Sequence, residues 1–589
     1  MSTFWRLLGF LRPFRSGVTW SLVLAGAATA GTVAIPALTG AAVDAIQRQD
    51  SGDLRRLGIL IAVAGTVRWG LSVARRLVAG RVSLGVELLL RQRLYDHLQS
   101  LELGFFDRQQ TGQLMSRATV DLQSVRFFLG YGLVWILQSA LTISFTAVAM
   151  IVIDPVLAII ALSPVPFVVW VSARYGRRSR PALQEVQQRI AELTANAEED
   201  IGGVRVVKSF AQEQRRYANF ERSASRVFTQ QMVSTRLAAF YNPLIGFLPQ
   251  IGLALLLIVG GRQVITGNTS LGDFTAFYAY LLALLGPMRS LGISLGLAQR
   301  ATASGARLFQ ILDRKPQLVA PADAPPLPDG AGDVRLDRVT LRYPGASADA
   351  LSDLSLHVPA GTTLALVGGT GSGKTSLVAI LARLYDVTEG SVLVDDADVR
   401  SVDLRSLRAS IAIVDDNPFL FSASVRDNIA YARPDATDEE VEVAARRAQA
   451  HEFIARLPDG YATRVGERGL TLSGGQRQRV AIARALVADP RILVLDDATS
   501  SVDATTEQLI KEALREAMAG RTTFVIAHRL STIALADEIA VLEAGRLVAK
   551  GTHDELLESD SLYREIVEKG LPDQVFLTRR PAEPRAAGL

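Results

Sequence analysis

The strongest constraint on the fold of this chain is a series of six long apolar segments in its first half. Each can cross the hydrocarbon core of a membrane, which is about 30 Å thick and takes roughly 20 helical residues. Buried helices of a large soluble domain are the alternative, but six such segments with so few charges argue against them. The sequence therefore predicts an all-α, six-helix transmembrane domain, with spans near 18–40, 57–80, 128–152, 156–176, 243–265 and 272–295.

The distribution of arginine predicts which side of the membrane each connection occupies. Three arginines precede the first span, and the two long connections, Arg81–Phe127 and Tyr175–Pro243, are rich in arginine. These regions should be cytoplasmic, although the connection Gln47–Arg56 also carries arginines on the other side. The basic, aromatic N-terminus shows no signal-cleavage pattern and is typical of an interfacial amphipathic helix that leads into a retained membrane span. We expect a multi-pass protein of the cell inner or plasma membrane, in contact with lipid.

The composition excludes several kinds of site and partner. The 589 residues include no cysteine, which rules out disulfides, thiol catalysis and cysteine-ligated metals. The five histidines form no paired zinc motif. A net charge of +4 gives no broad basic field, so nucleic acid is not an expected partner.

A change of composition divides the chain into domains. Residues 1–312 hold the spans, and residues 313–332 are rich in proline, alanine and aspartate, as linkers are. In residues 333–572 short β runs alternate with helical patterns, which predicts a soluble α/β domain. Residues 573–589 should form a polar, mobile tail. An even number of spans returns the chain to the cytoplasm, where the α/β domain should therefore lie.

A glycine-rich loop in the α/β domain predicts nucleotide binding. The sequence GGTGSGKTS follows an apolar strand and precedes a helix, which is the context that a P-loop requires. Its glycines let backbone N–H groups converge on phosphates at a helix N-terminus. Lys374 should reach the β- and γ-phosphates, while Thr375 and Asp496, which ends another apolar strand, should hold Mg²⁺. The residues predicted to bind ATP here are Gly368, Thr370, Gly371, Ser372, Gly373, Lys374, Thr375 and Ser376.

Two further side chains are candidates for the same site. Tyr343 could stack on adenine, although an ordinary strand tyrosine is the alternative. His528 ends an apolar strand and could hydrogen-bond the γ-phosphate, although a structural histidine is the alternative.

A second glycine motif points to a second subunit. In LSGGQ, two glycines follow a serine at a predicted helix start and form another anion-binding terminus. The P-loop already fills the phosphate site of this domain, so the second terminus implies a nucleotide held by another subunit. The residues are Leu472, Ser473, Gly474, Gly475 and Gln476, and with them the sequence resembles the ATP-binding cassette family over essentially the whole chain.

The resemblance implies a multidomain half-transporter of the type IV exporter fold: a six-helix transmembrane domain followed by a P-loop ATPase domain with a helical subdomain, working as a dimer with ATP and Mg²⁺. Val465–Gly469 and a D-loop with Asp503 also match the family pattern. By the same resemblance, residues near Thr119–Ser124 and Phe210–Arg215 should form the coupling helices that dock on the ATPase domains.

The chain departs from the family at two positions. The family places a glutamate, the general base, after the magnesium-site aspartate, and this chain has Asp497. The family also places a glutamine five residues before Phe421, where this chain has Asp416, which could still bind Mg²⁺. Because LSGGQ is intact, the favoured interpretation is a heterodimer in which this chain's own site is slow or degenerate. A homodimer that uses aspartate as its base is the alternative.

Cargo and direction stay open at this point. Arg68 lies in the second span, and an intramembrane charge is a functional candidate, so a small-molecule or lipid-like cargo with an anionic group is one interpretation. A structurally paired arginine is the other. An importer of the same fold, an ATP-gated channel or receptor, and a DNA-clamping ATPase are the rival functions, and the six spans argue against the last.

Overall fold

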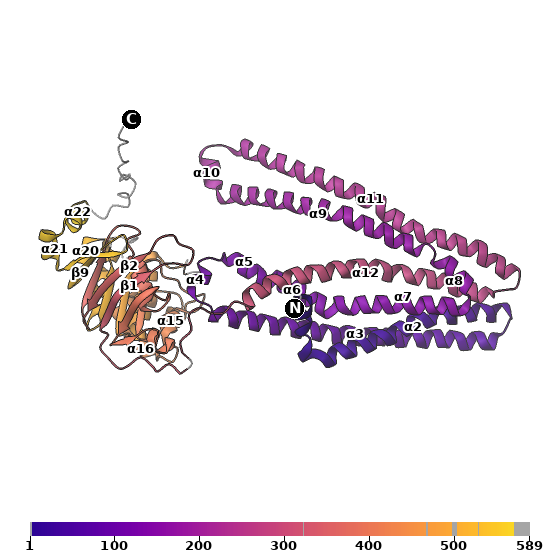
Figure 1. Ribbon diagram of the computed structural model, residues 1–589, viewed down its shortest axis with the longest axis horizontal. Coiled ribbons are helices and arrows are strands. Elements are labelled where there is room, and N and C mark those ends of the chain that lie inside the picture. The colour runs from indigo at the N-terminus through magenta and orange to yellow at the C-terminus, as the bar shows by residue number, and fades with distance from the viewer. Residues whose placement is uncertain are drawn as a thin grey trace, which may run out of the picture. The chain divides into compact units, whose positions relative to one another are not determined.

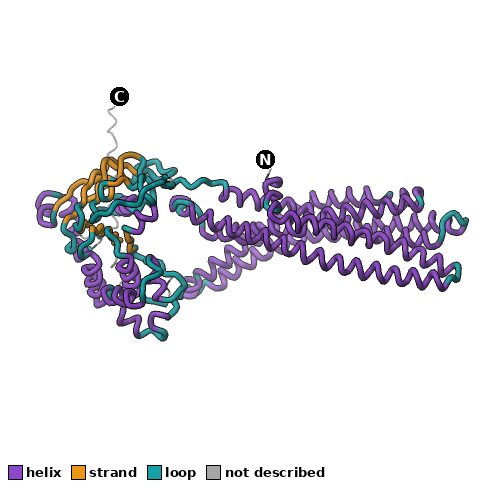
Figure 2. Tube along the Cα trace, turned by 90° about the horizontal axis from the view of Figure 1, so that it is seen from below, coloured by secondary structure: helices purple, strands orange, loops and turns teal. Residues whose placement is uncertain are grey.

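The computed structural model describes residues 3–321, 323–466, 469, 471–496, 504–527 and 529–569. Its contacts divide the chain into two units. The helical unit comprises residues up to 99 together with Thr111–Arg314, and the α/β unit comprises Ser100–Gln110 together with the chain from Lys315. Strands occur in the α/β unit, whereas the helical unit is built from long helices (Figure 2).

Within the described residues, six helical runs of the helical unit are long and apolar enough to span a membrane, and each overlaps one predicted span, which confirms all six. The elements are α1 (Thr3–Gly9), η1 (Arg12–Phe14), α2 (Arg15–Gln47), α3 (Ser51–Ser100), α5 (Thr111–Ser116), η2 (Arg117–Asp121), α6 (Leu122–Phe127), η3 (Phe128–Gly132), α7 (Leu133–Ile153), α8 (Pro155–Leu162), α9 (Val165–Gly202), α10 (Val204–Ser209), α11 (Glu213–Ile265) and α12 (Leu271–Leu312).

Local chemistry explains where these helices begin and how closely they pack. The Asp154 carboxylate accepts hydrogen bonds from two backbone N–H groups at the start of α8, and Ser270 caps α12 through the Asp273 N–H. A Cβ on Gly40 of α2 would lie 2.4 Å from the Gly272 carbonyl of α12, so small residues allow these helices to approach closely. Helices α9 and α11 run side by side as a pair (Figure 1).

The described residues of the α/β unit form two sheets. The first is antiparallel in the order β2-β1-β4-β5, and the second, in the order β10-β9-β3-β8-β7-β6, is parallel except for the edge strand β10. The strands are β1 (Val334–Leu341), β2 (Leu351–Val358), β3 (Thr363–Val367), β4 (Glu389–Val394), β5 (Ala397–Asp398), β6 (Ile411–Val414), β7 (Ile492–Asp496), β8 (Thr522–Ile526), β9 (Glu538–Glu543) and β10 (Arg546–Gly551). Strands β3, β7 and β8 are mostly apolar and almost entirely buried, as strands of a covered parallel sheet are.

Helices cover the second sheet and form the expected helical subdomain, which confirms the predicted fold class. They are α13 (Lys374–Leu381), α14 (Leu404–Ala409), α15 (Val425–Ile429), η4 (Ala430–Ala432), α16 (Asp438–Arg447), α17 (His451–Ala455), η5 (Gly460–Ala462), α18 (Gly474–Ala488), α19 (Ala504–Met518), α20 (Leu530–Ile533), α21 (His553–Ser559) and α22 (Ser561–Lys569). The predicted tail, 573–589, lies outside the described residues.

The short helices between the spans lie elsewhere than the resemblance implied. The segment that folds with the α/β unit is Ser100–Gln110, which contains the helix α4 (Leu103–Phe106). The extended backbone of Glu102 separates α4 from α3. The prediction for 119–124 is wrong, because these residues continue the helical run of the helical unit, where Asp121 pairs with Arg307 of α12.

The second short helix is displaced by about one and a half turns. It is α10, Val204–Ser209, whereas most of the range 210–215 already belongs to the linker and to α11. Gly203, outside the helical backbone region, precedes α10, and Ala211, with a φ of 49°, follows it. These two breaks set the bounds of the helix.

Candidate ATP site

The P-loop connects β3 to α13 with a backbone that only glycine adopts freely. Gly368, Gly371 and Gly373 have φ values of 156°, 79° and 103°. A Cβ on Gly368 would lie 2.2 Å from the Leu542 carbonyl, and one on Gly373 would lie 2.7 Å from the Ala350 carbonyl. The loop is therefore pressed against its neighbours and needs glycine for both space and conformation. This cradle fits a polyphosphate, which approaches backbone N–H groups closely.

Lys374 opens α13 and is held inside this loop. Its side chain is buried, and the ammonium donates hydrogen bonds to the carbonyls of Gly368 (2.8 Å) and Gly369 (3.0 Å). Burial lowers the pKa of Lys374, while the negative charge of Asp496 opposes this shift. A cation fixed at this point can reach phosphate oxygens bound in the loop. Ser372 is buried beside it, whereas Thr370 and Gly371 are exposed at the tip.

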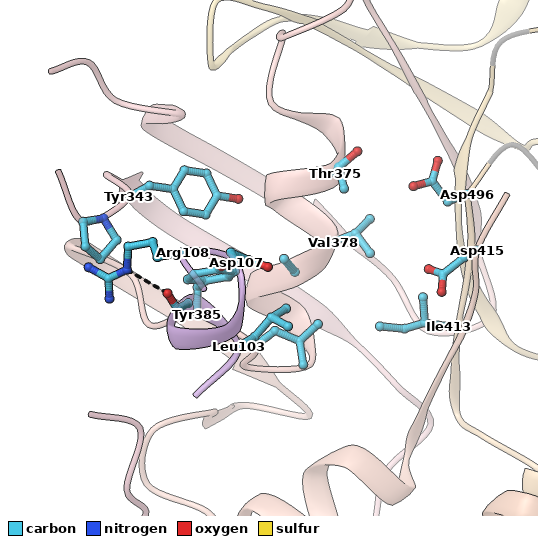
Figure 3. A pocket seen from close by; sticks show the side chains of 14 residues that line it. Leu103, Asp107, Arg108, Tyr343, Thr375, Val378, Tyr385, Ile413, Asp415 and Asp496 are labelled. Atoms are coloured by element: carbon cyan, nitrogen blue, oxygen red, sulfur yellow. Dashed lines mark hydrogen bonds between the residues drawn. The ribbon is translucent and has the colours of Figure 1, made fainter. Parts of the chain in front are cut away.

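A pocket of about 470 Å³ adjoins the start of α13. Figure 3 shows Asp415 and Asp496 on one side of it, Tyr343 on the other, and Thr375 between them. Strands β6 and β7 are parallel neighbours. Asp415, which follows β6, and Asp496, which ends β7, therefore meet at the same edge of the sheet. One hydroxyl and two carboxylates are oxygen ligands of the kind that Mg²⁺ takes, so the residues fit this ion.

The acid that follows β6 into the pocket is Asp415, which the sequence analysis did not select. Asp416, which it did select, does not line this pocket, and both carboxylates are exposed in the single chain. Desolvation, and secondarily the Asp416 carboxylate, raise the pKa of Asp415. The signal that could have identified Asp415 is its position directly after a buried parallel strand.

Tyr343 lies beside the P-loop helix. Its hydroxyl donates a 3.0 Å hydrogen bond to Ser376 Oγ, and its ring meets the Tyr385 ring edge-on with centroids 4.8 Å apart. Both tyrosines line the pocket, together with residues of the α4 segment. Tyr385 and the α4 segment are parts of the pocket that no local sequence signal identified.

The LSGGQ residues occupy the start of α18, in the helical subdomain. Ser473 caps this helix in a reciprocal box with Gln476, in which Ser473 Oγ accepts from the Gln476 N–H at 3.3 Å and Gln476 Oε1 accepts from the Ser473 N–H at 2.9 Å. Leu472 and Gly475 are buried, whereas Ser473 is exposed. None of these residues lines the pocket beside the P-loop among the described parts of the chain.

Three of the predicted site residues, Asp497, Asp503 and His528, lie outside the described residues, so their roles stay predictions. Arg68 lies on α3 of the helical unit, where its Cβ would be 3.4 Å from a Cβ added to Gly31 of α2. It is exposed in the single chain, and its role as a cargo contact also stays a prediction.

Comparison with known proteins agrees with this architecture. Family models match residues 18–288, as an ABC transporter transmembrane region, and residues 351–500, as an ABC transporter. The chain is 36% identical to the uncharacterized ABC transporter ATP-binding protein YknU of Bacillus subtilis, over 96% of this chain and 97% of that one. It is 38% identical to the multidrug efflux ATP-binding/permease protein Rv0194 of Mycobacterium tuberculosis, over 99% of this chain but only 49% of that longer protein.

A solved structure of a bacterial Atm1-family ABC exporter with ATP bound matches with a TM-score of 0.78 and 30% identity, covering 97% of this chain and 99% of that one. Together with the six spans and the P-loop, these matches settle the family. The chain belongs to the ABC transporters, as an exporter-type integral membrane protein whose cytoplasmic ATP-binding domain is an ATPase coupled to transport.

Proposed function

We propose that this chain is one subunit of a heterodimeric exporter with two unequal ATP sites. Its own P-loop helps to build a slow or degenerate site, and its LSGGQ motif, Leu472–Gln476, serves a normal site on a partner half-transporter. The observation that carries the proposal is the pairing of an intact signature motif with Asp497, where the family has glutamate.

At this chain's own site, the P-loop amides and Lys374 hold the phosphates of ATP, and Tyr343 packs on the adenine. Thr375 and Asp496 hold Mg²⁺, with Asp415 or Asp416 as a further acidic group beside it. The bound ion supplies charge neutralisation for the phosphates. The contacts of Lys374 inside the loop, and the position of Tyr343 in the pocket that Thr375 and Asp496 also line, support these assignments.

Asp497 is the general base of this site, and His528 contacts the γ-phosphate. The aspartate carboxylate stops one methylene short of the position that a glutamate would reach. A misplacement of about 1 Å can cost roughly 10²-fold in rate, so binding should persist where hydrolysis is slow. A homodimer with aspartate as a sufficient base is the alternative.

Apolar side chains that are exposed on the single chain support the presence of a second subunit. At the cytoplasmic turn around α10, Ile201, Val204, Val206 and Phe210 are 74%, 51%, 61% and 71% exposed. This turn joins the long charged ends of α9 and α11, where lipid tails cannot cover it. Protein has to cover such a cluster, and a partner half-transporter is the occupant that this family supplies. Asp503, in the D-loop, would contact the partner near the shared nucleotides.

The cargo is a hydrophobic or amphipathic compound, including those with an anionic group. The name of Rv0194, a multidrug efflux protein, supports export of such compounds, and Arg68 is the intramembrane charge that an anionic group would meet. Import by the same fold is the alternative direction.

Affinity purification of the tagged chain from its native membrane tests the heterodimer. The expected result is an equimolar second ABC half-transporter that carries glutamate at the position of Asp497. Recovery of this chain alone, as a dimer with full ATP turnover, would contradict it. ATP-driven flux of an amphipathic dye into inside-out vesicles, absent in Lys374→Ala, tests transport against the channel or receptor alternative.

A further inference from the structure

Helix α1 is fixed to the cytoplasmic end of α12. The Arg6 guanidinium donates hydrogen bonds of 2.7 and 2.5 Å to the Asp313 carboxylate, which follows the last residue of α12. Arg6 Cζ also lies 3.7 Å from the centroid of the Phe309 ring, on which Phe10 stacks, and Leu7 of α1 is buried. Because the chain continues from α12 to the cytoplasmic ATP-binding domain, these contacts place α1 on the cytoplasmic side of the membrane.

The start of α2 lies beside α3 at this end. A Cβ on Gly17 of α2 would lie 2.7 Å from Val82 Cγ2, and a Cβ on Gly85 of α3 would lie 2.5 Å from Phe14 Cε1. The turn η1, the first turn of α2 and residues 81–85 of α3 therefore meet where the first two spans reach the cytoplasmic surface of the membrane.

Three exposed arginines occur at this meeting point. They are Arg12 in η1, Arg15 at the start of α2 and Arg81 on α3. Among the residues that the structure describes, none of the three has a carboxylate within ion-pair distance, in contrast to Arg6. The first 43 residues of the chain contain no aspartate or glutamate, so the local sequence supplies no counter-charge. The three cations therefore form a positive surface that is open to an anionic partner.

Two exposed aromatic side chains identify the layer in which this surface lies. Trp5 of α1 and Trp20 of α2 are 62% and 61% exposed, and tryptophan is enriched at the headgroup level of membranes. Val23, one turn beyond Trp20 within the first span, is 53% exposed and continues the lipid-facing surface. The arginines thus adjoin side chains that lipid covers, at the level of the phosphate groups.

We propose that Arg12, Arg15 and Arg81 form a docking surface for the phosphate groups of anionic phospholipids in the cytoplasmic leaflet, with Trp5 and Trp20 in the headgroup layer beside it. Such a surface selects a lipid with a net negative headgroup, such as phosphatidylglycerol, over a zwitterionic one. One arginine near an anionic headgroup contributes a preference of about fivefold. This surface requires neither a particular partner subunit nor a particular cargo.

Because the chain has no native cysteine, one fluorescent label can report which lipid lies at this surface. Ser16, which is exposed beside Arg15 in the first turn of α2, is changed to cysteine and carries an environment-sensitive dye in the full-length protein. The protein is reconstituted in phosphatidylcholine vesicles with increasing fractions of a lipid that bears a quenching nitroxide near the top of its acyl chain. The quencher lipid is either phosphatidylglycerol or phosphatidylcholine, so the ratio of the two half-quenching fractions measures the preference for the anionic headgroup.

In wild type we expect half-quenching at a fraction of phosphatidylglycerol at least about fivefold lower than that of phosphatidylcholine. Arg12→Gln and Arg15→Gln should each lower this preference, and the triple variant with Arg81→Gln should bring the ratio to about one. Arg15→Lys keeps the charge and should retain most of the preference. Arg222→Gln, an equal change of charge at an exposed position on the cytoplasmic part of α11, is the matched control and should leave the ratio unchanged.

Equal half-quenching fractions for the two lipids in wild type would overturn the proposal. A preference that survives in the triple variant would also overturn it, because a general attraction of the cytoplasmic face would then explain the enrichment. A loss in Arg222→Gln as large as that in Arg15→Gln would assign the effect to net charge.

Two further outcomes would assign the surface to another occupant and so contradict the proposal. If inorganic phosphate removes the preference while chloride at the same ionic strength does not, the arginines bind free phosphate and not lipid. If neither quencher lipid reaches the dye, protein covers the surface.

Discussion

The crowding around Gly373 predicts a difference between two alanine variants of the P-loop. Gly371 and Gly373 both have positive φ values, 79° and 103°. A Cβ on Gly371 meets nothing within 4 Å, whereas one on Gly373 lies 2.7 Å from the Ala350 carbonyl oxygen and 2.8 Å from Leu351 Cδ2. The pair therefore separates the cost of backbone conformation from the cost of lost space, within one loop.

The magnitudes follow from general values for each effect. A left-handed conformation costs a residue with Cβ about 1–2 kcal/mol, and the lower entropy of the unfolded chain offsets about 0.4–1 kcal/mol of this. Gly371→Ala should thus lose roughly 1 kcal/mol. Gly373→Ala should lose about 1–3 kcal/mol more, because its Cβ meets backbone that cannot move aside freely. For a domain of this size, that difference lowers the unfolding midpoint of Gly373→Ala by roughly 2–12 °C relative to Gly371→Ala.

Scanning calorimetry of the purified protein without nucleotide measures this difference. Added ATP raises the unfolding temperature of the unit that binds it, and this shift identifies the transition of the α/β unit. Equal midpoints for the two variants, or a lower midpoint for Gly371→Ala, would refute the assignment of Gly373 as the crowded position.

Three further predictions concern the same unit. Asn428→Ala should destabilise it by about 2–4 kcal/mol in calorimetry, because the buried amide serves both the N–H and the carbonyl of Phe421 and accepts from Arg484; a loss below about 0.5 kcal/mol would contradict this. Ser473→Ala and Thr437→Ala each remove a helix cap and should each lower the stability of the unit by about 1 kcal/mol. Only Ser473→Ala should also lower ATP turnover in the assembled transporter. Equal turnover in both variants would contradict a role for the signature serine. Chelation of Mg²⁺ should abolish turnover while ATP binding persists more weakly in a titration, and turnover that survives chelation would contradict the metal site.

Features that depend on local patterns could be predicted from the sequence. The six spans follow from the length of each apolar run, since about 20 residues are needed whatever the neighbours are. The P-loop follows from glycines and a lysine at fixed spacing between a strand and a helix. The start of α18 follows from the capping pattern of Ser473 and Gln476.

Features that depend on distant contacts could not be predicted. Asp107 and Tyr385, which share a hydrogen bond, are 278 residues apart, and Asp121 and Arg307 are 186 apart, so no local pattern reports either pair. The second pair ties residues 119–124 to α12 within the helical unit.

Which residues line the pocket beside the P-loop depends on how the loop after β6 folds, and this could not be predicted from the sequence. Asp415 directly follows β6, whereas Asp416 lies one residue further along, in the bend after the strand. Counting back from Phe421 by the family pattern selected Asp416, whereas the side chain that lines the pocket belongs to Asp415.

The most direct test of the unequal-site proposal is steady-state ATP turnover of this chain purified alone, measured beside its Asp497→Glu variant. We predict that the wild-type chain is nearly idle and that glutamate raises turnover by a factor approaching 10², because it restores the missing reach of about 1 Å. Similar, substantial turnover in both proteins would contradict the degenerate site and favour a self-sufficient homodimer.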